Sequence, residues 1–196
     1  MAKSGRYKVP MRRRREGKTD YRRRLALLKS GKVRLVVRKT NRYIIAQFVE
    51  YNPEGDRVLC HAYSKELDRY GWKHSKKNIP AAYLTGYLAG LRAVNKGITS
   101  AILDIGRHPS TKESRIYAVL KGALDAGVDI PHGEEILPSE ERIRGEHIAS
   151  YASSLSDEDL KTKFSELLKA GADPRMIPED FDSVLEKIKV EGGSQK

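Results

Sequence analysis

Seven arginines lie within residues 11–24, which read M-R-R-R-R-E-G-K-T-D-Y-R-R-R. A guanidinium group binds phosphate through two parallel hydrogen bonds and stacks on nucleobases, which the Lys ammonium does less well. Only Glu16 and Asp20 offset the positive charges within this stretch. Because like charges at this spacing repel one another, the run adds nothing to the stability of a folded domain. It predicts binding of a polyanion, with a merely solvated tail as the alternative.

Aromatic side chains interleave with the basic ones in this N-terminal segment, at Tyr7 and Tyr21. Aromatic rings among cations are typical of surfaces on which unpaired bases stack. The candidate RNA-binding residues here are Arg6, Tyr7, Lys8, Arg12, Arg13, Arg14, Arg15, Lys18, Tyr21, Arg22, Arg23 and Arg24.

A second basic cluster occupies a predicted hairpin turn and comprises Arg38, Lys39, Thr40, Asn41, Arg42 and Tyr43. A basic hairpin tip is often only an exposed turn. Beside the N-terminal segment, however, it would extend the basic surface across one edge of the sheet. We therefore favour a second RNA contact at this turn.

Two further basic loops precede predicted helices. In the first, the candidate RNA-binding residues are Trp72, Lys73, Lys76 and Lys77. The three lysines and the backbone N–H groups at the helix start are suited to a phosphate; an ordinary loop with a half-buried Trp72 is an equal alternative. The second loop contains Arg107 and His108 between a strand and a helix, a place where open α/β sheets often bind ligands. It lacks the glycine spacing of a phosphate-binding loop, so contact with RNA or with a neighbouring protein stays open.

Catalytic chemistry has little support in the sequence. Asp104, Glu113, His108, Cys60 and His61 are the groups available for it. Adjacent residues on a strand face opposite sides, so Cys60 and His61 cannot form a nucleophile–base pair. A single cysteine also excludes an internal disulfide and a cysteine-based zinc site. We expect no enzyme activity, metal or cofactor.

The positive charge is concentrated at one end of the chain. The net charge is +12 for the 196 residues, with +14 in residues 1–40, +4 in 41–133 and −6 in 134–196. A basic total favours a nucleic-acid partner, with an anionic membrane surface as the alternative. The acidic C-terminal third is accordingly a poor place to expect phosphate contacts. No run approaches about 18 apolar residues, so we expect no transmembrane helix. The single cysteine, Cys60, favours a reduced, cytosolic setting.

Hydrophobic periodicity and turn residues predict an α/β fold with a mixed sheet and helices on its faces. Residues 1–17 are expected to form an extended tail, and Thr19 or Asp20 to cap a helix whose Leu25, Leu27 and Leu28 turn towards a core. The predicted strands span residues 32–39, 43–51, 57–63 and 100–105. A helical turn is predicted at residues 64–70. The predicted helices span residues 21–29, 79–95, 112–126, 139–153, 156–170 and 178–190, the last three forming an acidic appendage.

Three segments carry a family resemblance: K-T-N-R-Y-I-I-A-Q at residues 39–47, W-K-H-S-K-K-N-I-P-A-A-Y-L-T-G-Y-L-A-G at 72–90, and A-V-L-K-G-A-L-D-A-G-V-D-I-P-H-G at 118–133. The chain resembles the archaeal form of the large-subunit ribosomal protein eighteen family, whose eukaryotic counterpart is large-subunit protein five and which binds 5S ribosomal RNA. The resemblance runs from about residue 7 to about residue 151, and is looser beyond 156.

This resemblance implies a three-layer α/β/α domain of ribonuclease-H-like topology without catalytic carboxylates. It implies a cytoplasmic, ribosome-bound protein that attaches 5S to 23S ribosomal RNA in the central protuberance, beside neighbouring large-subunit proteins. No membrane or small-molecule substrate is implied. Arg12–Arg15 and Arg38–Tyr43 fall on the RNA-contacting segments of the family. We divide the chain into a basic RNA-threading tail (1–18), an α/β domain that binds 5S ribosomal RNA (19–130) and a helical extension (131–196).

Two rival functions remain from the residues alone. One is a nuclease built on the implied topology around Asp104. The other is a protein-interaction module in which the acidic segment 134–196 does the work.

Overall fold

The computed structural model describes residues 4–191. Residues 1–3 of the predicted tail and 192–196 of the predicted extension lie outside this range. The strands are β1 (Arg34–Lys39), β2 (Ile44–Glu50), β3 (Arg57–Tyr63) and β4 (Ile102–Asp104). The α-helices are α1 (Arg12–Arg15), α2 (Tyr21–Leu28), α3 (Ile79–Asn95), α4 (Arg115–Asp125), α5 (Glu140–Arg144), α6 (Glu146–Ser154), α7 (Asp157–Lys163), α8 (Ser165–Lys169) and α9 (Ile177–Glu191). Short 3-10 helices are η1 (Ser64–Tyr70), η2 (Glu134–Ile136) and η3 (Pro174–Met176).

The four strands form one mixed sheet in the order β3-β2-β1-β4. Strands β1, β2 and β3 make an antiparallel meander, whereas β4 pairs with β1 in parallel. The short connections between β1, β2 and β3 allow the hairpins, while the parallel strand returns only after helix α3. The predicted α/β fold with a mixed sheet is therefore confirmed.

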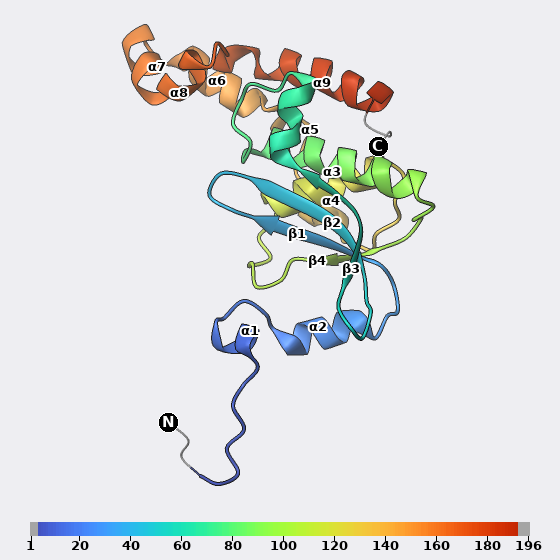
Figure 1. Ribbon diagram of the computed structural model, residues 1–196. Helices are drawn as coiled ribbons and strands as arrows, with labels where there is room; N and C mark the ends of the chain where they lie inside the picture. The colour runs from blue at the N-terminus through green and yellow to red at the C-terminus, as the bar shows by residue number, and fades with distance from the viewer. Residues whose placement is uncertain (1–3, 192–196) are drawn as a thin grey trace.

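Successive side chains along each strand point to opposite faces of the sheet, and helices α3 and α4 bury one of these faces (Figure 1). On this face lie Leu35, Val37, Ala46, Phe48 and Ala62, each fully buried. Small residues let the two helices approach each other closely. A Cβ atom on Gly86 of α3 would lie 2.1 Å from the carbonyl oxygen of Val119 in α4, so only glycine fits there.

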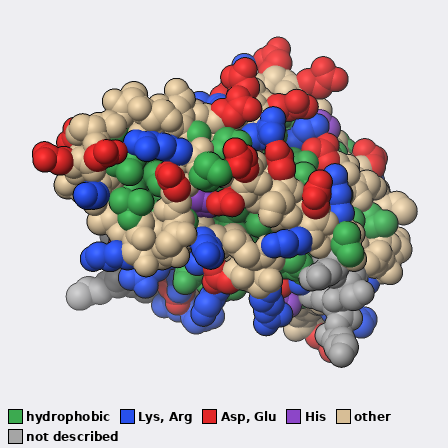
Figure 2. All heavy atoms as spheres, turned by 90° about the horizontal axis from the view of Figure 1, so that it is seen from above, with side chains coloured by type: hydrophobic (Ala, Val, Ile, Leu, Met, Phe, Trp, Pro, Cys, Tyr) green, Lys and Arg blue, Asp and Glu red, His purple; other side chains and the backbone are tan. Residues whose placement is uncertain are grey.

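Helices α5 and α9 of the extension cover the outer side of α3 (Figure 1). Ile143, Ile177 and Phe181 belong to the same hydrophobic core as the sheet, and the rings of Phe181 and Tyr83 lie 5.6 Å apart. The predicted helix 139–153 is broken at Gly145 (φ +83°), where a Cβ would lie 2.6 Å from a side-chain carbon of Ile177. Figure 2 shows acidic and basic side chains interspersed over the face formed by these C-terminal helices.

Helix α2 lies on the opposite side of the sheet, and Figure 1 shows it as a separate layer below the strands. Two expectations for this region were wrong. Arg12–Arg15 forms one helical turn rather than an extended chain. Leu25 does not turn towards the core, because its side chain is 57% exposed, and α2 has no buried residue.

Candidate nucleic-acid interface

The basic N-terminal arm, defined here as residues 4–28, presents its cations to solvent. Arg6, Tyr7 and Lys8 are exposed, as are all four arginines of α1. Helix α2 begins at Asp20, whose carboxylate accepts hydrogen bonds from the backbone N–H groups of Arg23 and Arg22. These bonds hold the pKa of Asp20 below its usual value. The cap separates the cations of α1 from Arg22 and Arg23 on the exposed side of α2.

Acidic partners within the arm are few. Glu16 lies 3.7 Å from Arg12 and 3.0 Å from Lys18, and Asp20 lies 3.6 Å from Arg23. Arg13 donates from Nε to Thr19 Oγ1 at 2.8 Å, a neutral acceptor. Arg14, Arg15 and Arg22 form no ion pair with any residue of the described range 4–191. Their charges are therefore available to an external anion. Tyr21, the remaining candidate of the arm, is half-buried.

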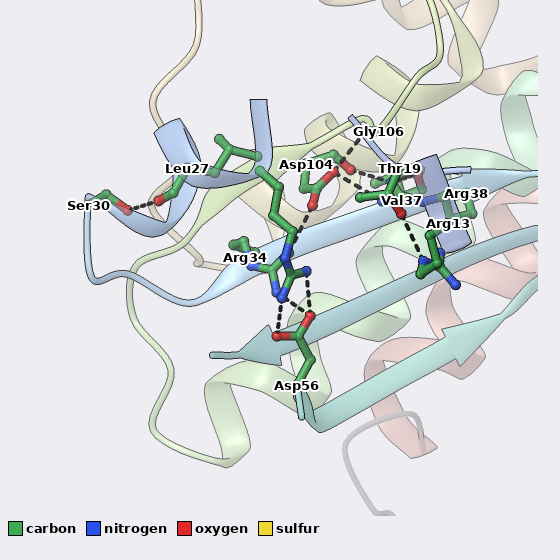
Figure 3. Close-up of polar contacts among 11 residues, drawn as sticks. Arg13, Thr19, Leu27, Ser30, Arg34, Val37, Arg38, Asp56, Asp104 and Gly106 are labelled. Atoms are coloured by element: carbon green, nitrogen blue, oxygen red, sulfur yellow. Dashed lines mark hydrogen bonds and ion pairs between the residues drawn. The ribbon is translucent and has the colours of Figure 1, made fainter. Parts of the chain in front are cut away.

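An ionic chain connects the arm to the sheet (Figure 3). Arg24 donates to both oxygens of Asp56 at 2.7 Å, and Asp56 also accepts from the buried Arg34 at 2.7 Å. Arg34 reaches Asp104 at 3.0 Å, and Asp104 reaches Arg38 at 3.1 Å. The hydrogen bond from Arg24 is the main cause that holds the pKa of Asp56 below its usual value. Arg24 and Arg38 thus support the arm and the sheet in this conformation, rather than extending freely into solvent.

A cleft of about 910 Å³ lies between the arm and the face of the sheet opposite helices α3 and α4. Its walls include Arg13, Lys18 and Arg23 from the arm and Arg38 from β1. Arg107 lies beside Gly17 of the arm, since a Cβ on that glycine would be 3.9 Å from its guanidinium. The structure therefore brings Arg107 of the β4–α4 loop beside the basic arm.

His108 lies near the end of β1 that leads into the first hairpin turn. Partial burial is the main cause that lowers the pKa of His108, and the charges of Lys39 and Arg38 lower it further. A lowered pKa favours the neutral imidazole, which lacks the charge that attracts a phosphate.

The hairpin tip is an exposed turn that is closed by several hydrogen bonds. Thr40 bonds to Tyr43 through both its backbone N–H and its hydroxyl group, and its Oγ1 accepts from the backbone N–H groups of Arg42 and Tyr43. Asn41 and Arg42 are exposed at the tip, and the Tyr43 ring lies 4.9 Å from that of Tyr63. These bonds fix the backbone from which Arg42 projects.

The prediction that Trp72 contacts RNA is wrong. Its side chain is fully buried in the core and its indole N–H donates to the carbonyl oxygen of Ser75 at 3.2 Å. The alternative, an ordinary loop with a half-buried Trp72, also underestimates the burial of this ring. Lys73 and Lys77 of the same loop are exposed, and Lys76 pairs with Asp68 at 2.9 Å.

Sequence reasoning missed two buried polar side chains that organise these segments. Arg34 of β1 is 2% exposed. A charged residue within an otherwise apolar strand was the sequence signal that could have indicated its burial. His74 is also 2% exposed, with its Nε2 2.7 Å from the Asp180 carboxylate in α9. No local pattern could have predicted a contact between residues that lie 106 positions apart.

The groups considered for catalysis are not brought together. Both oxygens of Asp104 are occupied by Arg34, Arg38 and the backbone N–H of Gly106. Cys60 is buried, which raises the pKa of its thiol to about 11 and disfavours the nucleophilic thiolate. Within residues 4–191 no group of three His, Cys, Asp or Glu side chains is placed to hold a metal ion. None of the described helices is long and apolar enough to cross a membrane.

Comparison with known proteins gives a consistent set of relatives. A family profile described as "Ribosomal large subunit proteins 60S L5, and 50S L18" matches residues 5–99 and 93–133. "Large ribosomal subunit protein uL18" of Korarchaeum cryptofilum is 66% identical over 189 residues, covering 96% of this chain and 97% of the relative. Proteins of the same name from Methanothermobacter thermautotrophicus and Thermofilum pendens are each 51% identical, covering 96% of this chain and 98% and 97% of themselves.

Proposed function

The chain belongs to the family of large-subunit ribosomal proteins that comprises 60S L5 and 50S L18, and we propose that it binds 5S ribosomal RNA and helps attach it to 23S ribosomal RNA in the central protuberance. As a member of this family it is a structural constituent of the large ribosomal subunit and not an enzyme. Its proposed location is on cytoplasmic ribosomes, beside neighbouring large-subunit proteins that contact the acidic C-terminal helices.

The observation that carries this proposal is the set of exposed arginines on the N-terminal arm. Arg14, Arg15 and Arg22 lack ionic partners among residues 4–191, and Arg12 is paired only at 3.7 Å. Each such cation that meets a phosphate releases condensed counterions, which favours binding entropically. Lys39, Asn41, Arg42, Lys73, Lys77 and Arg107 extend the proposed RNA-binding surface beyond the arm, with Tyr7 and Tyr43 as stacking surfaces.

We also propose that the domain of residues 19–130 has ribonuclease-H-like topology and serves as a scaffold between the tail (1–18) and the extension (131–196). The order β3-β2-β1-β4, with β4 parallel to β1, supports this topology. A parallel bridge from Ser100 to Asp129 adds a further pairing after α4. The neutralisation of Asp104 by two arginines argues against the rival nuclease.

Chemical footprinting of 5S ribosomal RNA tests the proposed function. The RNA is probed alone, with the full chain, and with a chain lacking residues 1–24. We expect protection by the full chain and loss of part of it upon deletion. Unchanged protection without the arm would favour the rival module, and absence of protection by the full chain would overturn the 5S assignment.

A further inference from the structure

A second groove, of about 750 Å³, lies between three segments that are distant in the sequence. One wall is the hairpin tip 41–43, the second is the loop 73–77, and the third is formed by helices α7 and α8 of the extension. The cations on its walls are Arg42, Lys73, Lys76, Lys77 and Lys163. Among residues 4–191, Glu166 contributes the one carboxylate that lines it.

Most of these cations are not neutralised within the described range. Arg42, Lys73 and Lys77 form no ion pair with residues 4–191, and Lys76 pairs with Asp68 at 2.9 Å. Lys163 donates to the hydroxyl oxygen of Tyr151 at 3.0 Å and lies 5.4 Å from the centre of that ring. Both contacts of Lys163 are with the neutral side chain of Tyr151, so its charge remains available. The groove therefore carries a clear excess of positive charge.

The loop wall of the groove, residues 73–77, is held in place by contacts within the protein. The loop is held by three contacts: Trp72 donates to the backbone of Ser75, Arg115 donates to the carbonyl oxygen of Lys77 at 3.1 Å, and His74 contacts Asp180 of α9. The last contact ties the loop to the extension. A preformed array of cations binds a polyanion without the cost of ordering flexible segments.

Lys163 is the unexpected member, because it belongs to the C-terminal third whose net charge is −6. That average predicted few phosphate contacts, yet the fold places this lysine opposite Arg42 and Lys73 across one groove. Two half-buried aromatic side chains, Tyr43 and Phe164, also line it. Cations interleaved with aromatic rings suit a nucleic acid better than an acidic peptide, since bases stack on such rings.

We propose that this groove binds the phosphate backbone of ribosomal RNA, and that Lys163 of the C-terminal extension completes it. The proposal rests on the proposed function, to which it adds a site shared between the α/β domain and the extension. The two sources of the same chemistry are 5S and 23S ribosomal RNA.

The test compares two double variants of the full chain that remove the same charge. Lys73→Gln/Lys163→Gln alters the groove, whereas Lys65→Gln/Lys161→Gln removes two exposed lysines that do not line it. Binding to 5S and to 23S transcripts is measured separately over a range of salt concentrations. With at least one RNA, we expect the magnitude of the slope of log K against log salt to be smaller for the groove variant than for the control by about 1.5. Each lost phosphate contact reduces that magnitude by about 0.7–0.9, and the variant loses two cations.

The outcomes separate the two proposals. If the groove variant has a reduced salt slope with one transcript, this result supports the groove proposal and identifies which RNA occupies the groove. If the wild-type chain binds RNA and the groove variant behaves like the control with both transcripts, the groove proposal is overturned while the proposed function stands. If the wild-type chain binds neither RNA, both are overturned. Binding of polyglutamate to the same variants is measured in parallel. If the groove variant loses affinity for polyglutamate but for neither RNA, the groove binds an acidic protein segment and the RNA assignment is overturned.

Acetylation of lysines in the wild-type complex provides a second measurement that needs no variant. We expect RNA to protect Lys163 from acetylation and to leave Lys161, two residues earlier on the same helix, reactive. Equal reactivity of Lys163 with and without both RNAs would contradict the proposal.

Discussion

Arg24 and Asp56 form a bidentate ion pair, with each carboxylate oxygen 2.7 Å from a guanidinium nitrogen. The same carboxylate accepts from Arg34, whose side chain is only 3% exposed. One aspartate therefore joins the N-terminal arm to a buried cation of the sheet. Its two partners differ in burial, so the energetic consequences of losing each contact also differ.

Asp56→Ala should destabilise the protein by about 2 kcal/mol, because it leaves the buried Arg34 with Asp104 as its remaining acidic partner. Arg24→Ala should cost about 1 kcal/mol or less, since this pair is partly exposed. Urea unfolding measures both, with Glu54→Ala in the neighbouring exposed turn as a control within about 0.5 kcal/mol. Equal losses for Asp56→Ala and Arg24→Ala would contradict the asymmetry.

The lowered pKa of Asp56, caused first by its hydrogen bond from Arg24, predicts a pH dependence. A lowered folded-state pKa stabilises the protein above the unfolded value, near 3.9, and this stabilisation is lost as the pH falls through the folded value. Asp56→Asn should therefore differ most from wild type at neutral pH and progressively less below about pH 4. Unfolding free energies measured from pH 7 to pH 3 check this. A constant difference across that range would show that Asp56 titrates normally.

The sequence predicted those elements whose ends carry strong local signals. Strand β3 and helix α3 have the predicted bounds, because a turn at Asn52-Pro53-Glu54-Gly55 precedes the strand and Asn78 caps the helix, accepting from Ala81 N–H. The predicted Asp20 cap of α2 is likewise confirmed. Caps and turns depend on residues two or three positions apart, which a sequence displays directly.

The sequence could not reveal contacts that depend on the assembled fold. Arg34 and Asp104 lie 70 positions apart, and nothing near either residue indicates its partner. Leu25 resembles a core residue by helical spacing, yet α2 faces a cleft rather than a packed layer. The basic residues of the arm were recognised individually, while their convergence with Arg107 follows from the β4–α4 connection.

Replacement of Arg12–Arg15 by Ala should weaken binding of 5S ribosomal RNA and reduce its salt slope by up to about 3, as expected when four cations lose phosphate contacts. A matched control replaces the exposed Lys65, Lys161, Lys169 and Lys189 by Ala, which removes the same net charge. Filter binding at several salt concentrations measures both variants. If the two slopes fall equally, the total charge accounts for the effect and the arm has no specific role.

Gly86→Ala should destabilise the protein by about 3 kcal/mol or more, because the added Cβ would lie 2.1 Å from the Val119 carbonyl oxygen and would force α3 and α4 apart. Gly133→Ala is the control, since its Cβ would meet no atom within 4 Å and its φ is −92°. Thermal unfolding compares the two. A normal melting temperature for Gly86→Ala would show that the helices are packed less closely than described.

His74 joins the basic loop to the extension through its contact with Asp180, which lies in the first turn of α9. His74→Ala should lower the free energy of unfolding by about 2–4 kcal/mol, since it removes a fully buried ring beside Trp72 and leaves a cavity.

A double-mutant cycle with Asp180→Asn isolates the contact itself, for which we expect a coupling of about 1 kcal/mol. The matched control is Glu179→Gln, which removes the same charge from the preceding residue. Faster release of the extension by limited proteolysis from Asp180→Asn than from Glu179→Gln would show that this contact holds the extension on the domain. Equal rates of release and no coupling energy would assign that role to the apolar packing of α9 alone.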